Sequence, residues 1–440
     1  MTVAHGAARP AAGRRADRAA SAAAAAGHAN HVHRRLSKTL RPAPALIVIL
    51  AGVCAALHVG KLAPAIATLQ AALNLSLLQA GFLLSLVQLA GMTLGLALGA
   101  WADALGARRS MLIGLGTLAL ASALGGLATG AGPLMALRVA EGFGFMLVVL
   151  PAPGLVRALV PPARLSVMLG LWGTYMPLGT TLALLLGPLC IQLLGWRAWW
   201  WLLAALSLLM ALWLARVVPA PPQAVAPAAV LAAGSTGQWQ ASLRQTLCAP
   251  ATWLVAAIFA LYSGQWLAVI GFLPTIYGQA GVTGLWSGVL TALVAAANIG
   301  GNVVSGRLLQ RGVPPQRLLV LGFATMAGAA ALAFAGSASG ASSGASAGLR
   351  FVALLLFSGV GGLIPGTLFT LALRVAPGER ALASTVGWVQ QWSSLGQFVG
   401  PPLVAWLASQ AGGWQWTWVA TGLSSALGIA LTAVLMKRLR

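Results

Sequence analysis

The sequence LHVGKL, residues 57–62, lies in the middle of a long apolar run and returns in altered form as LYSGQW at residues 261–266. A second pair repeats GWRAWWWL, residues 195–202, as GWQWTWVA at residues 413–420. Similar segments that recur in the same order at a wide spacing indicate two related halves. We therefore expect the chain to contain two copies of one structural unit.

The composition of the 440-residue chain is that of an integral membrane protein. Hydrophobic residues make up 59% of the chain, charged residues only 7%, and the mean hydropathy is +0.89. Soluble domains carry about a quarter charged residues, so a soluble enzyme or binding domain is excluded. The net charge of +22 would suggest nucleic acid only if it were gathered on a soluble face.

Long unbroken apolar runs predict membrane-spanning helices, because membrane β-barrels show short alternating segments instead. Roughly 20 apolar residues span a bilayer as a helix. We expect an all-α integral membrane protein with twelve transmembrane helices. The expected spans are residues 45–70, 79–102, 110–130, 133–156, 166–194, 197–218, 250–276, 284–308, 317–337, 351–374, 381–409 and 415–436.

Arginine and lysine residues are concentrated in alternate loops between these spans. By this assignment, 22 of the 26 basic residues lie on one side of the membrane. The positive-inside rule assigns that side, with both chain termini, to the cytoplasm. We expect a multi-pass protein of the bacterial inner (plasma) membrane.

Changes in composition divide the chain into four parts. Residues 1–43 are rich in Ala, Arg and His and predict a disordered basic cytoplasmic tail, and residues 219–247 are rich in Pro, Ala and Gly and predict a cytoplasmic linker. Between them lies an N-terminal six-helix bundle at 44–218, followed by a C-terminal six-helix bundle at 248–440. The three cysteines share no metal-ligand spacing, so we expect neither a disulfide nor a metal site.

The loop after the second span, GAWADALGARRS at residues 99–110, is similar to the loop 2-3 signature of the major facilitator superfamily. That signature reads Gly-x-x-x-Asp-x-x-Gly-x-Arg-Arg, and the residues in register are Gly99, Asp103, Gly106, Arg108 and Arg109. The resemblance covers all twelve spans. It implies two six-helix bundles related by an axis along the membrane normal, with these five residues in a cytoplasmic gate.

Three further segments look like those of the cyanate permease and nitroimidazole transporter group. They are residues 167–179, 195–201 and 271–290. The tryptophans near 196–201 and 414–418 also predict an aromatic belt at the outer membrane interface.

Four ionisable residues lie at depth in the expected spans, where a charge must pair, face water or reach the surface. His58 and Lys61 lie three apart on span 1, and Arg138 and Glu141 lie three apart on span 4. The resemblance implies that spans 1, 4, 7 and 10 line a central cavity, so we expect Lys61 and His58 to bind substrate. Arg138 and Glu141 are expected to couple transport, with Glu141 as the proton carrier. The alternatives are a structural lysine and a buried structural ion pair.

The repeat suggests a second wall for the same site. Tyr262, Gln265 and Trp266 correspond to the segment around His58 and Lys61, and polar stripes on spans 8 and 11 add Asn298 and Gln390 as candidate substrate ligands. Such stripes can instead serve as hydrogen bonds between helices.

These features predict a secondary active transporter that moves a small solute, an organic or inorganic anion, by alternating access with proton coupling. The sequence contains no nucleotide-binding loop in a suitable context and no nucleophile–base set, so we expect no enzyme activity and no cofactor. The expected partners are a small-molecule substrate, a coupling ion and the lipid bilayer, with no nucleic acid and a monomeric state. A drug or metabolite efflux antiporter and a non-transporting membrane sensor remain alternatives.

Overall fold

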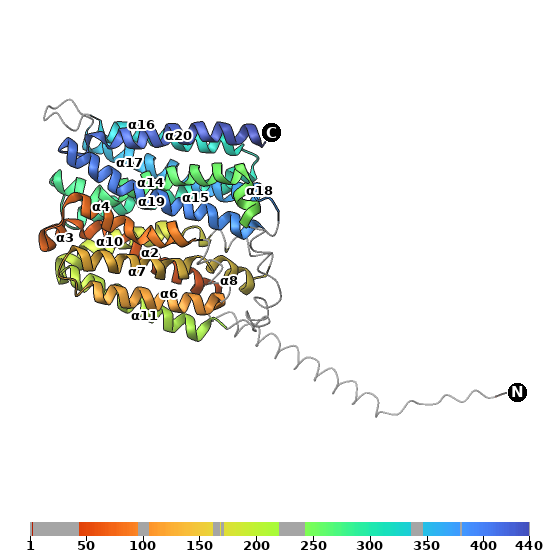
Figure 1. Cartoon of the computed structure of the whole chain (residues 1–440), viewed down its shortest axis with the longest axis horizontal. Coiled ribbons are helices and arrows are strands. Elements are labelled where there is room, and N and C mark those ends of the chain that lie inside the picture. Colours follow the sequence, from red (N-terminus) through yellow and green to blue (C-terminus); the bar gives the residue numbers. More distant parts are fainter. Residues whose placement is uncertain are drawn as a thin grey trace.

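The computed structural model describes residue 2 and residues 44–95, 105–161, 168, 171–219, 243–335, 346–378 and 381–439. These parts of the chain are helical and contain no β-strand. Figure 1 shows the helices lying side by side along one common direction. The expected tail and most of the expected linker lie outside the described residues, so the four-part organisation stays a prediction.

The first half contributes six helical stretches within its described residues. They are α2 (Pro44–Gly60) with η1 (Ala63–Ala65) and α3 (Ile66–Leu73), α4 (Leu77–Ser85) with η2 (Leu86–Gln88), α6 (Ala107–Gly125), α7 (Ala131–Val149) with α8 (Ala152–Leu159), α10 (Tyr175–Leu194) and α11 (Trp196–Val217). In Figure 1 these helices gather in the lower part of the bundle.

The second half contributes six stretches in the same order, again among its described residues. They are α14 (Pro250–Gln279), α15 (Leu285–Gln310), α16 (Pro315–Phe334), α17 (Ala347–Gly361) with α18 (Leu363–Val375), α19 (Leu382–Ala411), and η4 (Trp414–Trp416) with α20 (Thr417–Arg438). They form the upper part of the bundle in Figure 1. The fold class expected from the sequence is therefore confirmed.

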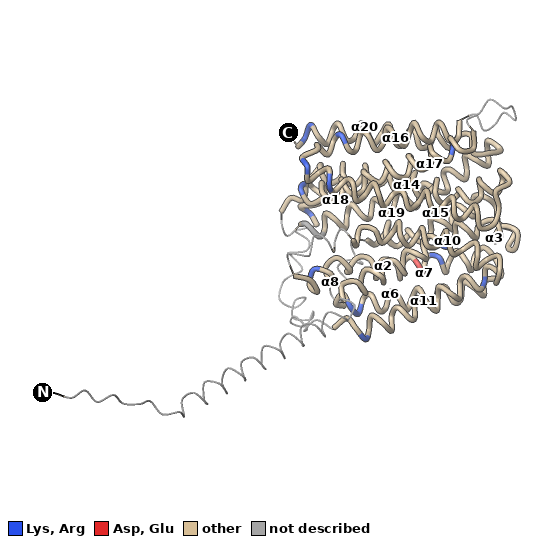
Figure 2. Tube along the Cα trace, turned by 180° about the vertical axis from the view of Figure 1, so that it is seen from behind, with Lys and Arg blue, Asp and Glu red and all other residues tan. Residues whose placement is uncertain are grey.

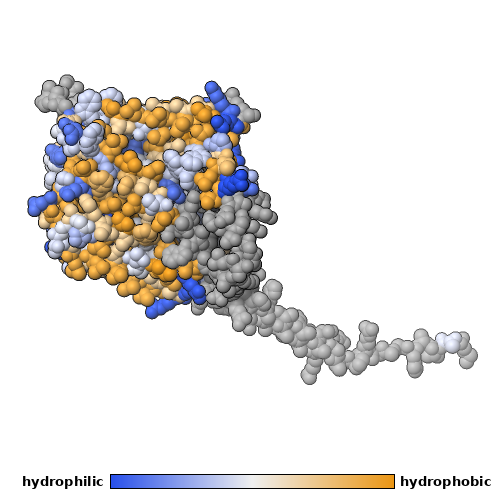
Figure 3. Space-filling model, in the orientation of Figure 1, coloured by the Kyte–Doolittle hydropathy of each residue, from blue (hydrophilic) through white to orange (hydrophobic). Residues whose placement is uncertain are grey.

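Ten of these stretches are long and apolar enough to cross a membrane. The other two, α6 and α19, are 19 and 30 residues long. Arg108 and Arg109 open α6, and α19 carries a series of glutamines and serines, which lowers the hydropathy of both. Figure 3 shows apolar side chains over most of the lateral face, as expected for a surface in contact with lipid.

The two halves repeat in three dimensions as well as in sequence. Gly60 lies against α10, where an added Cβ would approach Thr180 Cα at 2.9 Å, and its counterpart Gly264 lies against α19, 2.5 Å from Gly396 O by the same construction. In each half, glycine thus allows the first helix to pack directly on the fifth. The turn into the sixth helix uses a glycine with positive φ in both halves, 85° at Gly195 and 66° at Gly412.

The halves meet mainly through two pairs of helices, α4 with α19 and α10 with α15, and η1 also contacts α14. Gly81 on α4 packs against Pro402 of α19, and Gly288 on α15 packs against Pro188 of α10. Both contacts lie toward the end of the bundle opposite the C-terminus, which we call the far side. Small residues at these points allow the helices to approach closely.

Candidate functional site

The ionisable residues expected on spans 1 and 4 meet in one cluster inside the first half. His58 is in the last turn of α2, and Lys61 follows at the break between α2 and η1. Arg138 and Glu141 lie three apart on one face of α7. All four side chains are buried, with at most 1% of their surface exposed. We call this group the charge cluster.

Glu141 is the centre of the charge cluster. Its Oε1 accepts a hydrogen bond from the Lys61 ammonium, and its Oε2 accepts one from Arg138 Nη1 at 2.5 Å. His58 Nδ1 lies 3.6 Å from Glu141 Oε1, beyond hydrogen-bonding distance. One carboxylate therefore pairs with two cations, and each of its oxygens serves one of them.

The remaining donors of Lys61 are held by the third and sixth helices of the same half. Lys61 Nζ donates to Ser122 Oγ on α6 at 3.0 Å and lies 4.7 Å from the ring centroid of Trp200 on α11. Ser122 in turn donates to the carbonyl of Trp200 at 2.8 Å. Trp199 Nε1 donates to the carbonyl of Lys61 at 3.2 Å. These contacts enclose the ammonium within one bundle.

Arg138 and His58 tie the cluster to neighbouring backbone and side chains. Arg138 donates from Nη1 to the carbonyl of His58 at 2.7 Å and from Nε to the carbonyl of Leu83 at 3.1 Å. His58 Nε2 and Ser207 Oγ on α11 lie 2.7 Å apart. The cluster thus connects α2, α4, α6, α7 and α11, which belong to five of the six helical stretches of this half.

The charges of the cluster do not cancel. Lys61 and Arg138 carry two positive charges against the single negative charge of Glu141. Arg138 Nη2 and His58 Nδ1 are buried without a hydrogen-bond partner among the described residues. A buried charge is costly to keep in an apolar surrounding unless a counter-charge balances it. The charge cluster is therefore a candidate site for exchange of a proton or for an anion.

The polar residues expected in the second half form a separate, uncharged network. Asn298 Nδ2 donates to Tyr262 Oη at 2.8 Å and to the carbonyl of Ser358 at 2.9 Å, and Trp266 Nε1 donates to Ser358 Oγ at 3.1 Å. Gln265, the counterpart of Lys61, accepts from Ser425 Oγ on α20 at 3.2 Å. Lys61 and Gln265 thus both face the sixth helix of their own half.

Several positions differ from those expected. Lys61 was expected to face the central cavity, but its ammonium is enclosed by residues of its own bundle, so contact with substrate would require the cluster to open. The predicted aromatic belt is wrong for four buried tryptophans: Trp196, Trp199, Trp200 and Trp414. Trp199 and Trp200 pack against the charge cluster. Trp201 and Trp416 are exposed, as a belt requires.

The polar stripe on span 11, which is α19, contains side chains that contact the first half and one, Gln390, whose predicted role is substrate contact. Gln397 accepts from Gln88 Nε2 at 3.0 Å, and Ser394 donates to Gln88 Oε1 at 3.3 Å, so these side chains join α19 to the first half. Gln390 is half-buried on the same helix. The substrate contacts predicted for Gln390 and for the second-half residues remain predictions.

The gate motif lies only partly within the described residues, because Gly99 and Asp103 fall outside them. Gly106 has φ 83° and precedes α6. Arg108 donates from Nε to the carbonyl of Val218 at 2.8 Å and from Nη2 to that of Ala215 at 2.6 Å. It therefore satisfies carbonyl groups at the C-terminal end of α11, while Arg109 is exposed.

Sequence reasoning missed the residues that complete the charge cluster. Ser122, Trp200 and Ser207 lie on α6 and α11, and nothing in their local sequence marks them as neighbours of Lys61. The aromatic repeat at 195–202 predicts an interface feature, whereas Trp199 and Trp200 contact Lys61 in the charge cluster. Within the described ranges, no group of three or more His, Cys, Asp and Glu side chains is placed to hold a metal ion.

Comparison with known proteins identifies one matching family and several proteins of similar sequence. A family model described as the Major Facilitator Superfamily matches residues 48–386. The chain is 30% identical over 159 residues to the tetracenomycin C resistance and export protein of Streptomyces glaucescens, covering 36% of this chain and 30% of that relative. It is 31% identical over 315 residues to the chloramphenicol resistance protein of Streptomyces lividans, covering 68% of this chain and 72% of that relative.

A solved structure shares the fold. It is a bacterial homolog to the human lysosomal transporter Spinster in an inward-facing and unoccupied conformation. The TM-score is 0.71 at 16% sequence identity, and the match covers 90% of this chain and 98% of that chain.

Proposed function

Because the chain belongs to the major facilitator superfamily of transporters, we propose that it is a proton-coupled secondary carrier that exports a small uncharged molecule by alternating access. The two halves and their paired contacts through α4 with α19 and α10 with α15 support movement of one half against the other. Most described basic residues lie at the end of the bundle that carries the C-terminus (Figure 2). This distribution supports both termini being cytoplasmic in the bacterial inner membrane.

The observation that carries the coupling proposal is the charge cluster. With Lys61 and Arg138 protonated and Glu141 ionised, it holds one uncompensated positive charge. Release of a proton from Lys61 leaves the cluster neutral, whereas protonation of Glu141 leaves two buried cations without a counter-charge. We therefore assign the transported proton to the Lys61–Glu141 pair, with Lys61 rather than Glu141 as the group that releases it.

Alternating access supplies a way to load and unload this proton. The cluster lies among helices α2, α6, α7 and α11 of one half, and α2 breaks at Lys61. A movement that admits water to the break would give the Lys61–Glu141 pair a path for its proton, and closure would remove that path. Substrate movement and proton release are then linked through the same rearrangement of α2 and η1.

The proposed substrate class rests on the distribution of charged side chains between the charge cluster and the contacts that join the two halves. Among the described residues, the side chains that join the two halves are uncharged: Gln88, Gln391, Ser394 and Gln397. The relatives named above are resistance proteins, and one is also an export protein. These observations favour export of an uncharged compound. A drug or metabolite efflux antiporter is one of the alternatives that the sequence left open.

A small anion is the second candidate. The surplus positive charge of the cluster favours it, as does the resemblance to the cyanate permease and nitroimidazole transporter group. An anion that reached Lys61 would balance that charge and displace the contact with Glu141. A ligand screen that includes both uncharged compounds and small anions separates the two candidates.

Purified full-length protein should first be screened by thermal shift against chloramphenicol, tetracenomycin C, nitroimidazoles, cyanate and small carboxylates. A ligand at 100 times its dissociation constant stabilises the folded state by about 2.7 kcal/mol. The best ligand is then loaded into proteoliposomes with and without a pH gradient. Uphill movement that depends on the gradient supports a proton-coupled carrier. Movement that only follows the ligand gradient contradicts proton coupling.

A further inference from the structure

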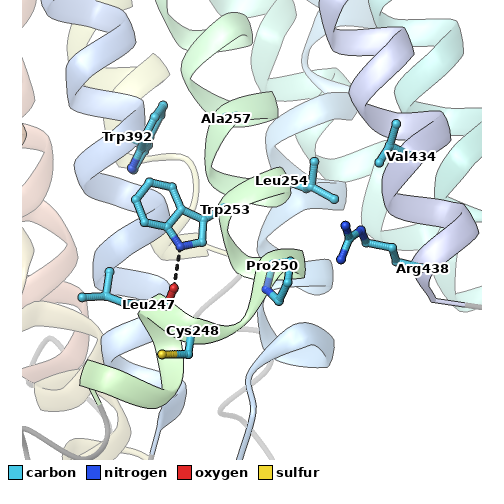
Figure 4. A pocket seen from close by; sticks show the side chains of 9 residues that line it. All are labelled: Leu247, Cys248, Pro250, Trp253, Leu254, Ala257, Trp392, Val434 and Arg438. Atoms are coloured by element: carbon cyan, nitrogen blue, oxygen red, sulfur yellow. Dashed lines mark hydrogen bonds between the residues drawn. The ribbon is translucent and has the colours of Figure 1, made fainter.

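A groove on the second half lies outside the charge cluster and away from the contacts between the halves. Its volume is about 420 Å³. Figure 4 shows the start of α14 at its centre, Trp392 of α19 on one side, and Val434 and Arg438 of α20 on the other. The lining residues are Leu247, Cys248, Pro250, Trp253, Leu254, Ala257, Trp392, Val434 and Arg438.

The groove runs from the end of the helices into the apolar body. Pro250 begins α14, and Ala257 lies seven residues further along, about 10 Å deeper at the rise of an α-helix. Leu254, Ala257 and Val434 make the inner wall apolar. The indoles of Trp253 and Trp392 pack edge to face at 5.7 Å between their ring centroids. The inner part is therefore suited to a hydrocarbon chain.

The outer end carries a positive charge. Arg438 is the one charged residue of the lining, is exposed, and lies in the last turn of α20, where a cation is favoured by the helix dipole. Glu141 is the only acidic residue in the described part of the chain, and it pairs with Lys61 and Arg138. The guanidinium is thus available to an anion from outside the described chain.

The groove has an apolar inner part and a cation, Arg438, at the level of the helix ends. An anionic phospholipid has the complementary arrangement of an apolar chain and a charged head group. We infer that this groove binds one anionic phospholipid of the cytoplasmic leaflet, with the phosphate at Arg438 and an acyl chain along Trp253, Leu254 and Val434. Tryptophan at this level is typical of residues that contact the boundary between head groups and chains. All lining residues belong to the second half or to the segment just before α14, so the site does not coincide with the space between the halves.

The test uses the full-length protein in mild detergent. It is incubated with equal amounts of phosphatidylglycerol and phosphatidylcholine of the same acyl chains, and retained lipid is counted by native mass spectrometry. The parent protein is expected to retain phosphatidylglycerol in preference to phosphatidylcholine. Arg438→Gln should lower phosphatidylglycerol retention about fivefold, the effect of one basic residue near a lipid head group.

Two further variants make the result specific. Lys437→Gln removes the same charge from the neighbouring residue, which is exposed and outside the lining, and should retain phosphatidylglycerol within about twofold of the parent. Ala257→Phe places a larger side chain in the inner wall without changing charge and should lower retention of both lipids. Equal retention of the two lipids by the parent, or equal losses in Arg438→Gln and Lys437→Gln, would overturn the assignment. Unchanged retention in Ala257→Phe would also contradict it.

Discussion

Lys61 and Glu141, 80 positions apart in the chain, are in direct contact inside the first half, and neither side chain is more than 1% exposed. The pair joins the end of α2 to the middle of α7. Breaking a buried ion pair by removing one partner leaves a charge without compensation, which typically costs about 3–5 kcal/mol. We therefore expect the contact to matter for stability as well as for the proposed coupling.

Removal of both partners is expected to cost less stability than the sum of the two single removals. Lys61→Met leaves Glu141 paired with Arg138, Glu141→Gln leaves two buried cations, and the double variant leaves Arg138 alone with an amide. We expect Glu141→Gln to be the least stable and the double variant to recover about 1–3 kcal/mol of the combined loss. Thermal unfolding in detergent measures all three, with Gln265→Met as the counterpart control in the second half. Strictly additive losses would show that Lys61 and Glu141 do not interact.

Removal of the Lys61 charge should separate coupling from substrate binding. Lys61→Met is expected to abolish accumulation driven by a pH gradient while ligand binding and exchange at equal concentrations persist, because the proton has lost its carrier. Lys61→Arg should fail in the same way, since a guanidinium does not release its proton in proteins. Proteoliposome flux and equilibrium binding are measured side by side. If Lys61→Met lost binding of an anionic ligand while remaining folded, Lys61 would be a substrate residue instead.

The close packing of α14 on α19 depends on glycine. A Cβ at Gly264 would lie 2.5 Å from Gly396 O, and one at Gly396 would overlap the carbonyl of Ala260. Gly396→Ala is expected to cost more than about 2 kcal/mol, because the helices must separate. Gly328 has open space at its Cβ position, so Gly328→Ala should be neutral or slightly stabilising. Detergent-stable yield and unfolding temperature compare the two, and equal effects would show that close packing is not the cause.

The amide of Gln88 should help to hold the two halves together. It donates to Gln397 and accepts from Ser394, both on α19. Gln88→Leu removes both bonds, each worth about 1 kcal/mol, and should increase the population with α4 and α19 apart at the far side about tenfold or more. Spin labels at Leu78 on α4 and Gln410 on α19, both exposed, report that separation. Gln70→Leu is the control, because the Gln70 side chain bonds within its own half, to the carbonyl of Leu75. An unchanged distance distribution in Gln88→Leu would refute this role.

Arg108 and Arg109 should behave differently although they are adjacent. Arg108 satisfies two carbonyls at the end of α11, whereas Arg109 is exposed. We expect Arg108→Gln to lower stability by about 1–3 kcal/mol and to slow transport, and Arg109→Gln to do neither beyond about 0.5 kcal/mol. Thermal unfolding and flux are the measurements. Equal behaviour of the two variants would leave the α6–α11 contact without a role.

Much of the fold follows from features that are local in the chain. An apolar run of 20 residues cannot leave its backbone groups unpaired in lipid, so it becomes a helix wherever it lies. The expected span at 250–276 matches α14 at Pro250–Gln279, and that at 317–337 matches α16 at Pro315–Phe334. The repeat of LHVGKL as LYSGQW also placed Gly60 and Gly264 in equivalent positions before any contact was known.

The ionisable residues of the charge cluster could also be identified from the local sequence around them. A charge on an apolar helix must have a partner, so Lys61 and Glu141 were singled out by their surroundings in the sequence alone. Their spacing within each helix also placed His58 with Lys61 and Arg138 with Glu141 on shared faces.

Only the tertiary structure determined which partner each charged side chain has and in which direction that side chain points. The direction of Lys61 depends on the rotation of α2 about its axis, which is set by the contact of Gly60 with α10 and of Trp199 with the Lys61 carbonyl. The same packing turned Trp200 inward to the ammonium instead of outward to the lipid interface. These contacts join residues 120 to 139 positions apart, and hydrophobic periodicity carries no information about such pairs. The sequence therefore determined the number and type of helices and the residues that need partners, while packing between helices determined the partners.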